Sequence, residues 1–203
     1  MACSTAMERT GTVLMLARHG ETEWSRSGQH TGRTDLPLLE DGRAAAAALG
    51  RRLAGRSFAL VLASPMARAR DTAAIAGFGG PELEITEDLM ELGYGEYEGR
   101  TTREIRVDRP GWEVWTGGSP GGEALEEAAA RADRVIERAL AVGGDAIVFG
   151  HGHILRILGA RWVGQPAAFA ASLALDTAAL CELGFERERR VLRCWNDTAH
   201  LAL

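Results

Sequence analysis

Three short apolar runs, each followed by polar residues and then a helical stretch, constrain the fold of this chain more than any other feature. The runs are Thr12–Ala17, Phe58–Ala63 and Ala146–Phe149. Continuous apolar runs of this length are typical of strands that are buried on both faces of a parallel sheet. Because strands that alternate with helices indicate an α/β fold, we expect a three-layer sandwich, with helices on both faces of a mainly parallel sheet.

The windows that follow these runs carry helix signals. The longest predicted helix, Glu123–Val142, has apolar residues at helical spacing and ends before Gly143. Ser64 is expected to cap the helix after the second run, with Pro65 in its first turn. The predicted helices are Asp41–Ala54, Met66–Ala76, Glu123–Val142 and His153–Val163.

Two other segments complete the predicted organisation. Thr177–Gly184 and Arg190–Trp195 alternate like strands around a charged turn, which predicts an antiparallel hairpin at the sheet edge and a surface on which a homodimer could form. Gly93–Gly122 holds eight glycines and two prolines, so we expect a loop-rich excursion suited to a substrate lid.

The composition fits one domain over residues 1–203, with residues 1–11 as a flexible tail. No apolar run is long enough to cross a bilayer, and the N-terminus lacks the pattern of a signal peptide. Three cysteines are a sparse, odd set that fits a reducing compartment. We therefore expect a cytoplasmic protein without a membrane partner.

All 23 basic residues are arginine, and the formal net charge is -5. The arginines are scattered along an acidic chain, whereas a nucleic-acid surface needs a clustered basic face. Binding to nucleic acid is therefore not expected.

Polar side chains follow the ends of the three predicted strands. Arg18 and His19 follow the first, Arg68 follows the second, and His151 follows the third. The carboxyl ends of parallel strands meet at one edge, where ligands bind. Arginine matches phosphate oxygens two at a time, and a neutral imidazole can attack phosphorus to form a covalent intermediate. This edge therefore predicts a phosphoryl-transfer site that needs no metal ion or other cofactor.

Seven ordered segments carry a further signal over nearly the whole chain. They are LARHGETEWSRSG (Leu16–Gly28), HTGRTDLPLLEDG (His30–Gly42), SPMARARDTA (Ser64–Ala73), LMELGYGEYEG (Leu89–Gly99), GGE (Gly121–Glu123), VFGHGH (Val148–His153) and NDTAHL (Asn196–Leu201). Together they resemble the histidine phosphatase superfamily, in its phosphoglycerate-mutase-like branch.

The resemblance implies a role for each residue of the predicted site. His19 would be the nucleophile that becomes phosphohistidine, and Arg18, Arg68 and His151 would form the phosphate pocket. Glu91 would give a proton to the leaving group and later act as the base for water.

The resemblance also implies substrate contacts from Thr31 and Gly32, which align with a phosphate-contacting loop, and from Gly152. Ser25 is a further candidate, but it stands where mutases and many relatives have Asn. A serine keeps a hydroxyl but has a shorter reach.

A hydrolase is favoured over a mutase. Mutases of the family usually have a longer insertion than Leu92–Gly150, and Trp24–Leu38 looks most like acid phosphatases and sedoheptulose-bisphosphatase-like enzymes. We therefore predict a metal-independent phosphatase, either a broad acid phosphatase or a sugar (bis)phosphatase, that acts on a small phosphorylated metabolite. A phosphoglycerate mutase and a catalytically inactive phosphate-binding module are the alternatives.

Some residues have a second interpretation. Glu21 and Glu23 compete with Glu91 as the acid, but we expect them beside Arg18 as an ion pair. His153, which follows His151 by two residues, could form a metal site with it, but no further ligand cluster stands nearby, so no metal is expected. His30 either lines the entrance or is exposed on a loop, and His200 is expected to satisfy a local hydrogen bond. Trp112 and Trp115 pack in the lid or shape the pocket.

Overall fold

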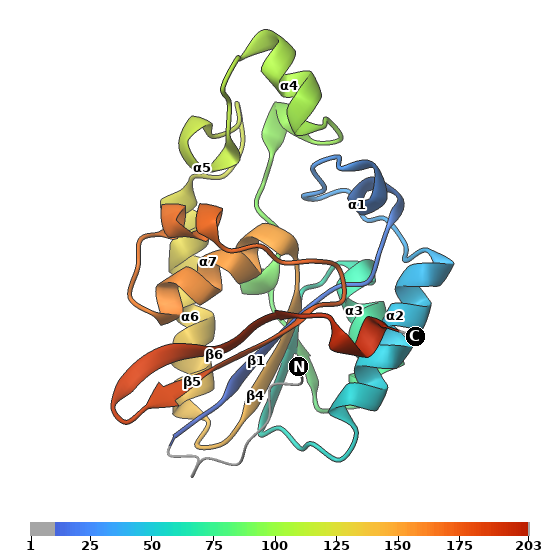
Figure 1. Ribbon diagram of the computed structural model, residues 1–203, viewed down its shortest axis with the longest axis vertical. Helices are drawn as coiled ribbons and strands as arrows, with labels where there is room; N and C mark the ends of the chain where they lie inside the picture. The colour runs from blue at the N-terminus through green and yellow to red at the C-terminus, as the bar shows by residue number, and fades with distance from the viewer. Residues whose placement is uncertain (1–10, 203) are drawn as a thin grey trace.

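The structure is a computed structural model that describes residues 11–202, so most of the predicted tail, residues 1–11, lies outside the described residues. Within that range the protein folds around one six-stranded sheet in the order β3-β2-β4-β1-β5-β6 (Figure 1). Strands β1 to β4 are mutually parallel where they pair, and β5 runs antiparallel to both β1 and β6. The strands are β1 (Leu14–Arg18), β2 (Leu60–Ala63), β3 (Leu83–Ile85), β4 (Ala146–Gly150), β5 (Leu180–Glu186) and β6 (Arg189–Asp197). The predicted mainly parallel sheet with an antiparallel edge is confirmed.

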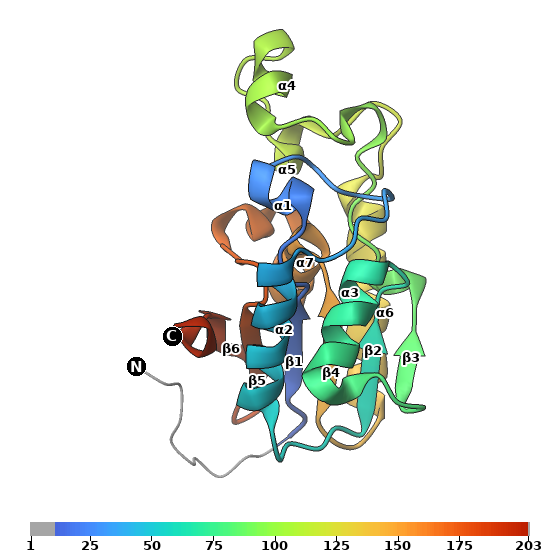
Figure 2. The ribbon, with the colours of Figure 1, turned by 90° about the vertical axis from the view of Figure 1, so that its right-hand side faces the viewer.

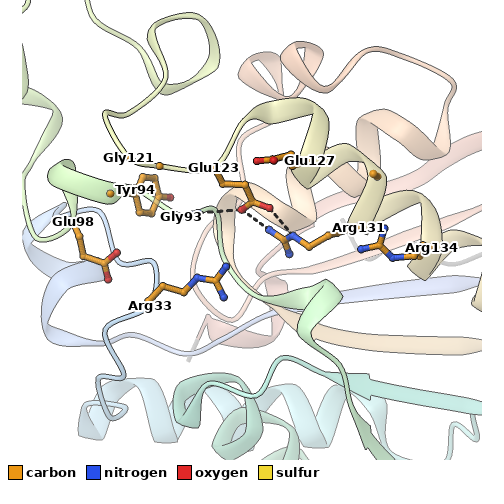
Figure 3. Close-up of a pocket in the computed structure, with 12 residues that line it drawn as sticks. Arg33, Gly93, Tyr94, Glu98, Gly121, Glu123, Glu127, Arg131 and Arg134 are labelled. Carbon is orange, nitrogen blue, oxygen red and sulfur yellow. Dashed lines mark hydrogen bonds and ion pairs between the residues drawn. The ribbon is translucent and has the colours of Figure 1, made fainter.

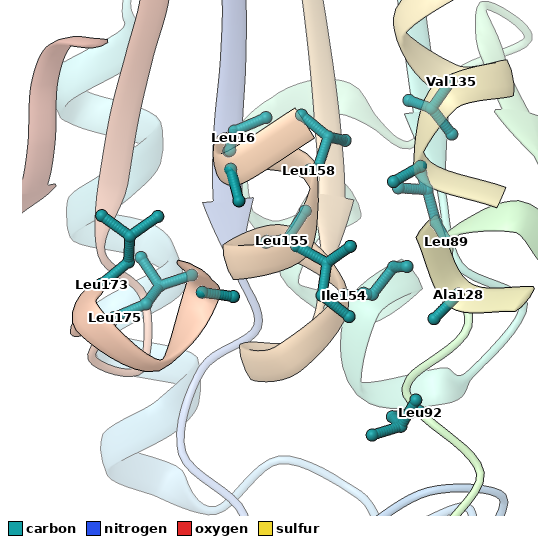
Figure 4. Close-up of a cluster of buried hydrophobic side chains, with 14 of the residues drawn as sticks. Leu16, Leu89, Leu92, Ala128, Val135, Ile154, Leu155, Leu158, Leu173 and Leu175 are labelled. Carbon is teal, nitrogen blue, oxygen red and sulfur yellow. The ribbon is translucent and has the colours of Figure 1, made fainter. Parts of the chain in front are cut away.

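Helices cover both faces of this sheet, as Figure 2 shows for α2 and α3 on one side and α6 and α7 on the other. Alternate residues of β1 serve the two layers. Leu14 and Leu16 join the apolar cluster beneath α6 and α7 (Figure 4), while Met15 packs with residues of α2 and β4 on the opposite face. The helices are α1 (Glu23–Ser27), α2 (Glu40–Leu53), α3 (Ala67–Ala73), α4 (Thr102–Asp108), α5 (Val114–Gly117), α6 (Leu125–Ala141) and α7 (Gly152–Trp162).

The four predicted helices form, with small shifts at their ends. The predicted helix Met66–Ala76 is divided between α3 and a π-helical turn at Ala74–Phe78. Helix α6 begins two residues later than predicted, because the side chain of Glu127 bonds back to the backbone N–H of Ala124. Short 3₁₀ turns lie at Glu87–Leu89, Gly95–Tyr97, Ala167–Ser172 and Ala199–Leu201.

The predicted capping role of Ser64 is wrong. Met66 is the N-cap of α3, and the backbone N–H of Ala67 donates to Asp35 Oδ1 at 2.8 Å. Ser64 lies at the end of β2, fully buried, and its hydroxyl lies 2.7 Å from Nε2 of His151. The serine therefore belongs to the polar edge of the sheet rather than to the helix.

The excursion predicted over Gly93–Gly122 forms the end of the molecule at the top of Figure 1, and it contains α4 and α5. It is anchored by buried aromatic side chains: Trp112 packs edge-on against Tyr97 at 5.3 Å between ring centroids, and Trp115 is 9% exposed. No helix among residues 11–202 is long and apolar enough to cross a membrane.

The register between β1 and β4 fixes what meets at the carboxyl edge. Arg18 pairs with Gly150, the last residue of β4, and the backbone N–H of His19 donates to the Gly150 carbonyl at 3.0 Å. His19 and His151 therefore leave neighbouring strands side by side.

Two glycines hold the turn after His19 against the start of α2. A Cβ on Gly20 would lie 2.3 Å from the carbonyl oxygen of Gly42, and a Cβ on Gly42 would lie 2.3 Å from that of Glu21. The backbones approach too closely for any side chain at either position.

This close contact predicts whether a substitution at Gly42 raises or lowers the free energy of unfolding. Gly42→Ala should lower the free energy of unfolding by about 1–3 kcal/mol, because the methyl group would push the two backbones apart. Helix propensity alone predicts a gain of about 1 kcal/mol at this position. Urea denaturation measures the change, and Ala44→Gly, at an exposed position of the same helix, calibrates the propensity term. A Gly42→Ala variant as stable as the parent would contradict the close contact.

Candidate active site

The two histidines predicted to meet at the carboxyl edge of the sheet lie together. The ring centroids of His19 and His151 are 5.2 Å apart, with an angle of 59° between the ring planes. His19 is 4% exposed and His151 is fully buried. Arg68 is also fully buried and contacts His151, so residues from three separate strand ends share one site.

The hydrogen bond at Nδ1 of His19 fixes its tautomer. Nδ1 lies 2.7 Å from the carbonyl oxygen of Gly20, which can only accept, so Nδ1 carries the proton and Nε2 carries the lone pair. Burial lowers the pKa of His19 to about 3, and the charges of Arg18 and Arg68 act in the same direction. His19 is therefore a neutral imidazole at neutral pH.

The side chain of Thr72, on α3, connects Arg68 to the turn after His19. Its hydroxyl donates to the Arg68 carbonyl at 2.7 Å and accepts from the backbone N–H of Gly20 at 3.0 Å. The sequence predicted neither Thr72 nor Ser64 as a residue of the site. Both lie within the motif Ser64–Ala73, where a buried hydroxyl cannot be told from a solvated one without the fold.

The Arg68 guanidinium ties the site to the loop that follows α1. Its Nε–H donates to Nδ1 of His151 at 3.1 Å, and its terminal nitrogens donate to the carbonyls of Thr34 at 2.8 Å, Gly32 at 3.0 Å and Thr31 at 3.3 Å. Four of its five N–H groups are thereby used, and one remains for a ligand.

Arg18 has spare donor capacity. One terminal nitrogen donates to the Leu175 carbonyl at 2.5 Å, while its buried Nε has no hydrogen-bond partner among the described residues. Burial lowers the pKa of Arg18, although Glu91 and Asp176 oppose that effect. A buried, charged donor without a partner is costly unless an anion binds to it.

Both ring nitrogens of His151 are engaged. Nδ1 accepts from Arg68, so in the neutral ring Nε2 carries the proton and donates to the Ser64 hydroxyl. Burial lowers its pKa well below the usual value, and the charge of Arg68 adds to this. The arginine therefore keeps the imidazole neutral.

Glu91 accepts three backbone hydrogen bonds. Oε1 accepts from Leu92 at 2.9 Å and from Ile154 at 3.0 Å, and Oε2 accepts from the N–H of His153 at 2.9 Å. Burial raises its pKa, but the hydrogen bonds from the ring and backbone of His153 outweigh this, so the pKa lies well below its usual value. The carboxylate is ionised in the free protein.

An aromatic cluster adjoins Glu91. Tyr94 Oη lies 2.7 Å from Nδ1 of His153, whose ring lies 4.8 Å from that of Trp115. The His30 ring packs 4.8 Å from Tyr94, and burial lowers the pKa of His30 to about 4. His30 is thus half-buried in this cluster rather than free on a loop, and Trp115 joins the excursion to α7.

The four predicted substrate-contact residues differ in how they contact Arg18 and Arg68. The carbonyls of Thr31 and Gly32 bind Arg68, and a Cβ on Gly152 would lie 3.4 Å from Cζ of Arg18. The hydroxyl of Ser25 is used in the capping box of α1 with Thr22. Ser25 also borders a cavity of about 580 Å³, which is lined by Arg18, Ser25, Asp176, Thr177, Thr198, Leu201 and Ala202.

The expected ion pair between Glu21 and Arg18 is wrong. Glu21 pairs with Arg26 of α1, which also pairs with Asp41, and Glu23 is exposed. The reason is that the turn closed by Gly20 and Gly42 directs Glu21 toward α1 and α2, whereas Arg18 stays buried near Glu91. Nε2 of His200 lies 3.0 Å from the Ala178 carbonyl, a local hydrogen bond as expected. Over residues 11–202, no group of three or more His, Cys, Asp and Glu side chains could hold a metal ion.

The sheet order and these motifs define the class of protein. The chain belongs to the histidine phosphatase superfamily (branch 1), whose family model matches residues 14–198. An acid phosphatase from Mycobacterium tuberculosis is 40% identical over 191 residues, which cover 92% of this chain and 93% of that protein. Sedoheptulose 1,7-bisphosphatase from Saccharomyces cerevisiae is 33% identical over 182 residues, which cover 74% of this chain and 67% of that enzyme.

A solved structure agrees. An open reading frame product from Mycobacterium tuberculosis superposes with a TM-score of 0.87 at 38% identity, covering 92% of this chain and 98% of that chain. The superfamily resemblance predicted from the motifs is confirmed.

The buried neutral state of His19 predicts how stability depends on pH. The pKa of His19 is about 3 in the folded protein and near 6.5 when unfolded, so the unfolded chain binds more protons between these values. Stability should therefore be complete above pH 6.5 and fall as the pH falls, by about 1 kcal/mol between pH 6 and pH 5 from this residue. Urea denaturation at a series of pH values measures the slope. His19→Gln should reduce it, and an equal slope in the two proteins would contradict the assignment.

Proposed function

We propose that this protein is a phosphatase that hydrolyses small phosphate monoesters, without a metal cofactor, through a phosphohistidine on His19. The observation that carries the proposal is a buried, neutral His19 with its lone pair on Nε2, next to an arginine whose Nε lacks a partner. A nucleophile and an unfilled anion site in one cleft suit attack on a phosphoryl group.

In the proposed first step, Nε2 of His19 attacks phosphorus and the bond from phosphorus to the ester oxygen breaks. The imidazole gains positive charge, which the hydrogen bond from Nδ1 to the Gly20 carbonyl stabilises. Arg18 and the free N–H of Arg68 neutralise charge on the phosphoryl oxygens. The Nε2–H of His151, which donates to the Ser64 hydroxyl in the free protein, turns to a phosphoryl oxygen when the substrate binds.

Glu91 is proposed to move the protons. It is ionised in the free protein, so it must gain a proton when the substrate binds. A nearby phosphate raises the carboxyl pKa through like-charge repulsion, and a substrate monoanion brings the proton that Glu91 then gives to the leaving alkoxide. The resulting carboxylate takes a proton from the water that attacks phosphohistidine, so inorganic phosphate leaves and His19 is regenerated.

Two relatives named as phosphatases support hydrolysis over transfer to a second hydroxyl. The short segment Leu92–Gly150 adds support, since water must reach the phosphohistidine in a phosphatase. We infer a small phosphorylated metabolite as the substrate and, from the sparse cysteines, the cytoplasm as the location.

The nucleophile is tested by His19→Ala. Release of inorganic phosphate from a panel of phosphate monoesters and sugar bisphosphates, in the presence of a chelator, should fall by about 10⁴-fold or more, because the covalent route is lost. Isomerised product is followed in parallel, and its appearance in place of phosphate would favour a mutase. Full activity of His19→Ala would eliminate the covalent mechanism, and a wild-type protein inactive on the whole panel would contradict the phosphatase.

The acid is tested by Glu91→Gln. An alkyl phosphate, whose leaving group needs a proton, should lose about 10²–10⁴-fold in kcat, while p-nitrophenyl phosphate should lose much less. Equal losses on both esters would remove Glu91 from this role.

A further inference from the structure

We propose that the buried ion pair between Glu123 and Arg131 positions Glu91, by fixing the backbone on both sides of it. This inference rests on the proposed function, because it concerns the proton donor of that reaction. Glu123 precedes α6 and Arg131 lies on α6, and their side-chain hydrogen bonds go to each other and to the backbone between Glu87 and Gly93 rather than to His19, Arg18 or Arg68. Both are positioning residues rather than catalytic residues.

The ion pair is bidentate and largely buried. Arg131 Nε donates to Glu123 Oε1 at 2.7 Å, and a terminal nitrogen donates to Oε2 at 2.8 Å (Figure 3). The two side chains are only 12% and 11% exposed. Such a parallel pair of charge-assisted bonds restricts the geometry of both groups.

Arg131 holds the chain just before Glu91. Its second terminal nitrogen donates to the carbonyl of Met90 at 2.7 Å, to that of Asp88 at 2.9 Å and to that of Glu87 at 3.4 Å. One guanidinium thereby gathers the carbonyls of a 3₁₀ turn and of the residue adjacent to Glu91.

Glu123 holds the chain just after Glu91. Its Oε2 accepts from the backbone N–H of Gly93 at 3.2 Å, and its own backbone N–H donates to the Gly93 carbonyl at 2.8 Å. Both polar groups of Gly93 are therefore bound by one residue. Glu91 lies between two clamped points, at Met90 and Gly93.

The surroundings explain why this segment needs a polar clamp. Gly93 and Tyr94 border a cavity of about 620 Å³ whose lining includes Arg33, Glu98, Glu127 and Arg134 (Figure 3). Leu89 and Leu92 are buried in the apolar core on one side of the segment, but on the other side Gly93 faces this cavity, where the clamp supplies contacts that packing does not. A shift of about 1 Å in a reacting group can cost about 10²-fold in rate.

The closing experiment compares Arg131→Met with Arg134→Met. Arg134 lies one turn later on α6 and pairs with Asp88 of the same segment, but it is 53% exposed and its hydrogen bonds go to the Asp88 side chain rather than to the backbone beside Glu91. For each variant, kcat and KM are measured with glycerol 2-phosphate and with p-nitrophenyl phosphate. Thermal unfolding is followed alongside.

We expect Arg131→Met to lower kcat for glycerol 2-phosphate by about tenfold or more, with a much smaller loss for p-nitrophenyl phosphate and an unchanged KM. Arg134→Met should match wild type on both. In a background of Glu91→Gln, adding Arg131→Met should cause no further loss on the alkyl ester, because both changes remove the same proton transfer. Glu123→Gln, which keeps the side-chain volume but not the charge, repeats the test if Arg131→Met does not fold.

Three outcomes would overturn the positioning role. One is an equal loss of kcat on the two esters, and another is an additive loss of kcat in the double variant. The third is that neither Arg131→Met nor Glu123→Gln lowers kcat. These outcomes differ from failure of the proposed function, in which the wild-type protein itself would release no phosphate or Glu91→Gln would not separate the two esters.

Discussion

The electrostatics of this site depend on two arginine charges beside two buried histidines. Arg18 and Arg68 lie in the same cleft as His19 and His151, and their charges add to burial in disfavouring the imidazolium forms. Both imidazoles are therefore neutral at neutral pH, and Nε2 of His19 keeps its lone pair. Glu91, held by three backbone N–H groups, lies near both arginines and opposes part of their charge. In the proposed mechanism, the arginines that keep His19 neutral also attract the phosphate of the substrate, which supplies a partner for the Nε–H of Arg18.

The sheet makes this arrangement possible through a single register. Arg18 pairs with Gly150, and the N–H of His19 continues the parallel ladder to the Gly150 carbonyl, so the two histidines leave adjacent strands at the same height. Around them, Thr72 and Ser64 use their hydroxyls to tie the turn after His19 and the ring of His151 to α3 and β2. The site is therefore held by regular elements, while the segment with Glu91 is held by polar contacts from α6.

Much of the fold and of the site could be predicted from the sequence, and there are physical reasons why the remaining features could not. Fully buried strands can be recognised in the sequence as apolar runs, and parallel strands end at one edge of the sheet. The meeting of His19, Arg68 and His151 could therefore be predicted. Ser64 was misassigned because a serine before proline carries the local signal of a helix cap, whereas its actual partner lies 87 residues away. Glu21 was misassigned because a turn of two glycines decides its direction. The role of Glu123 depends on contacts at both ends of a loop, and no spacing rule encodes these.

The excursion between Gly93 and Gly122 stands apart from the sheet. Trp115 joins it to the ring of His153 and the guanidinium of Arg156, and Glu98 joins it to the loop after α1 by accepting from the N–H groups of Gly32 and Thr34. Strand register and the positions of the two histidines do not involve it. Changes confined to α4 can therefore leave the two histidines in place, whereas changes at Glu98 would reach the loop whose carbonyls bind Arg68. The outer end of the molecule can thus vary in length and shape while the polar edge of the sheet stays the same.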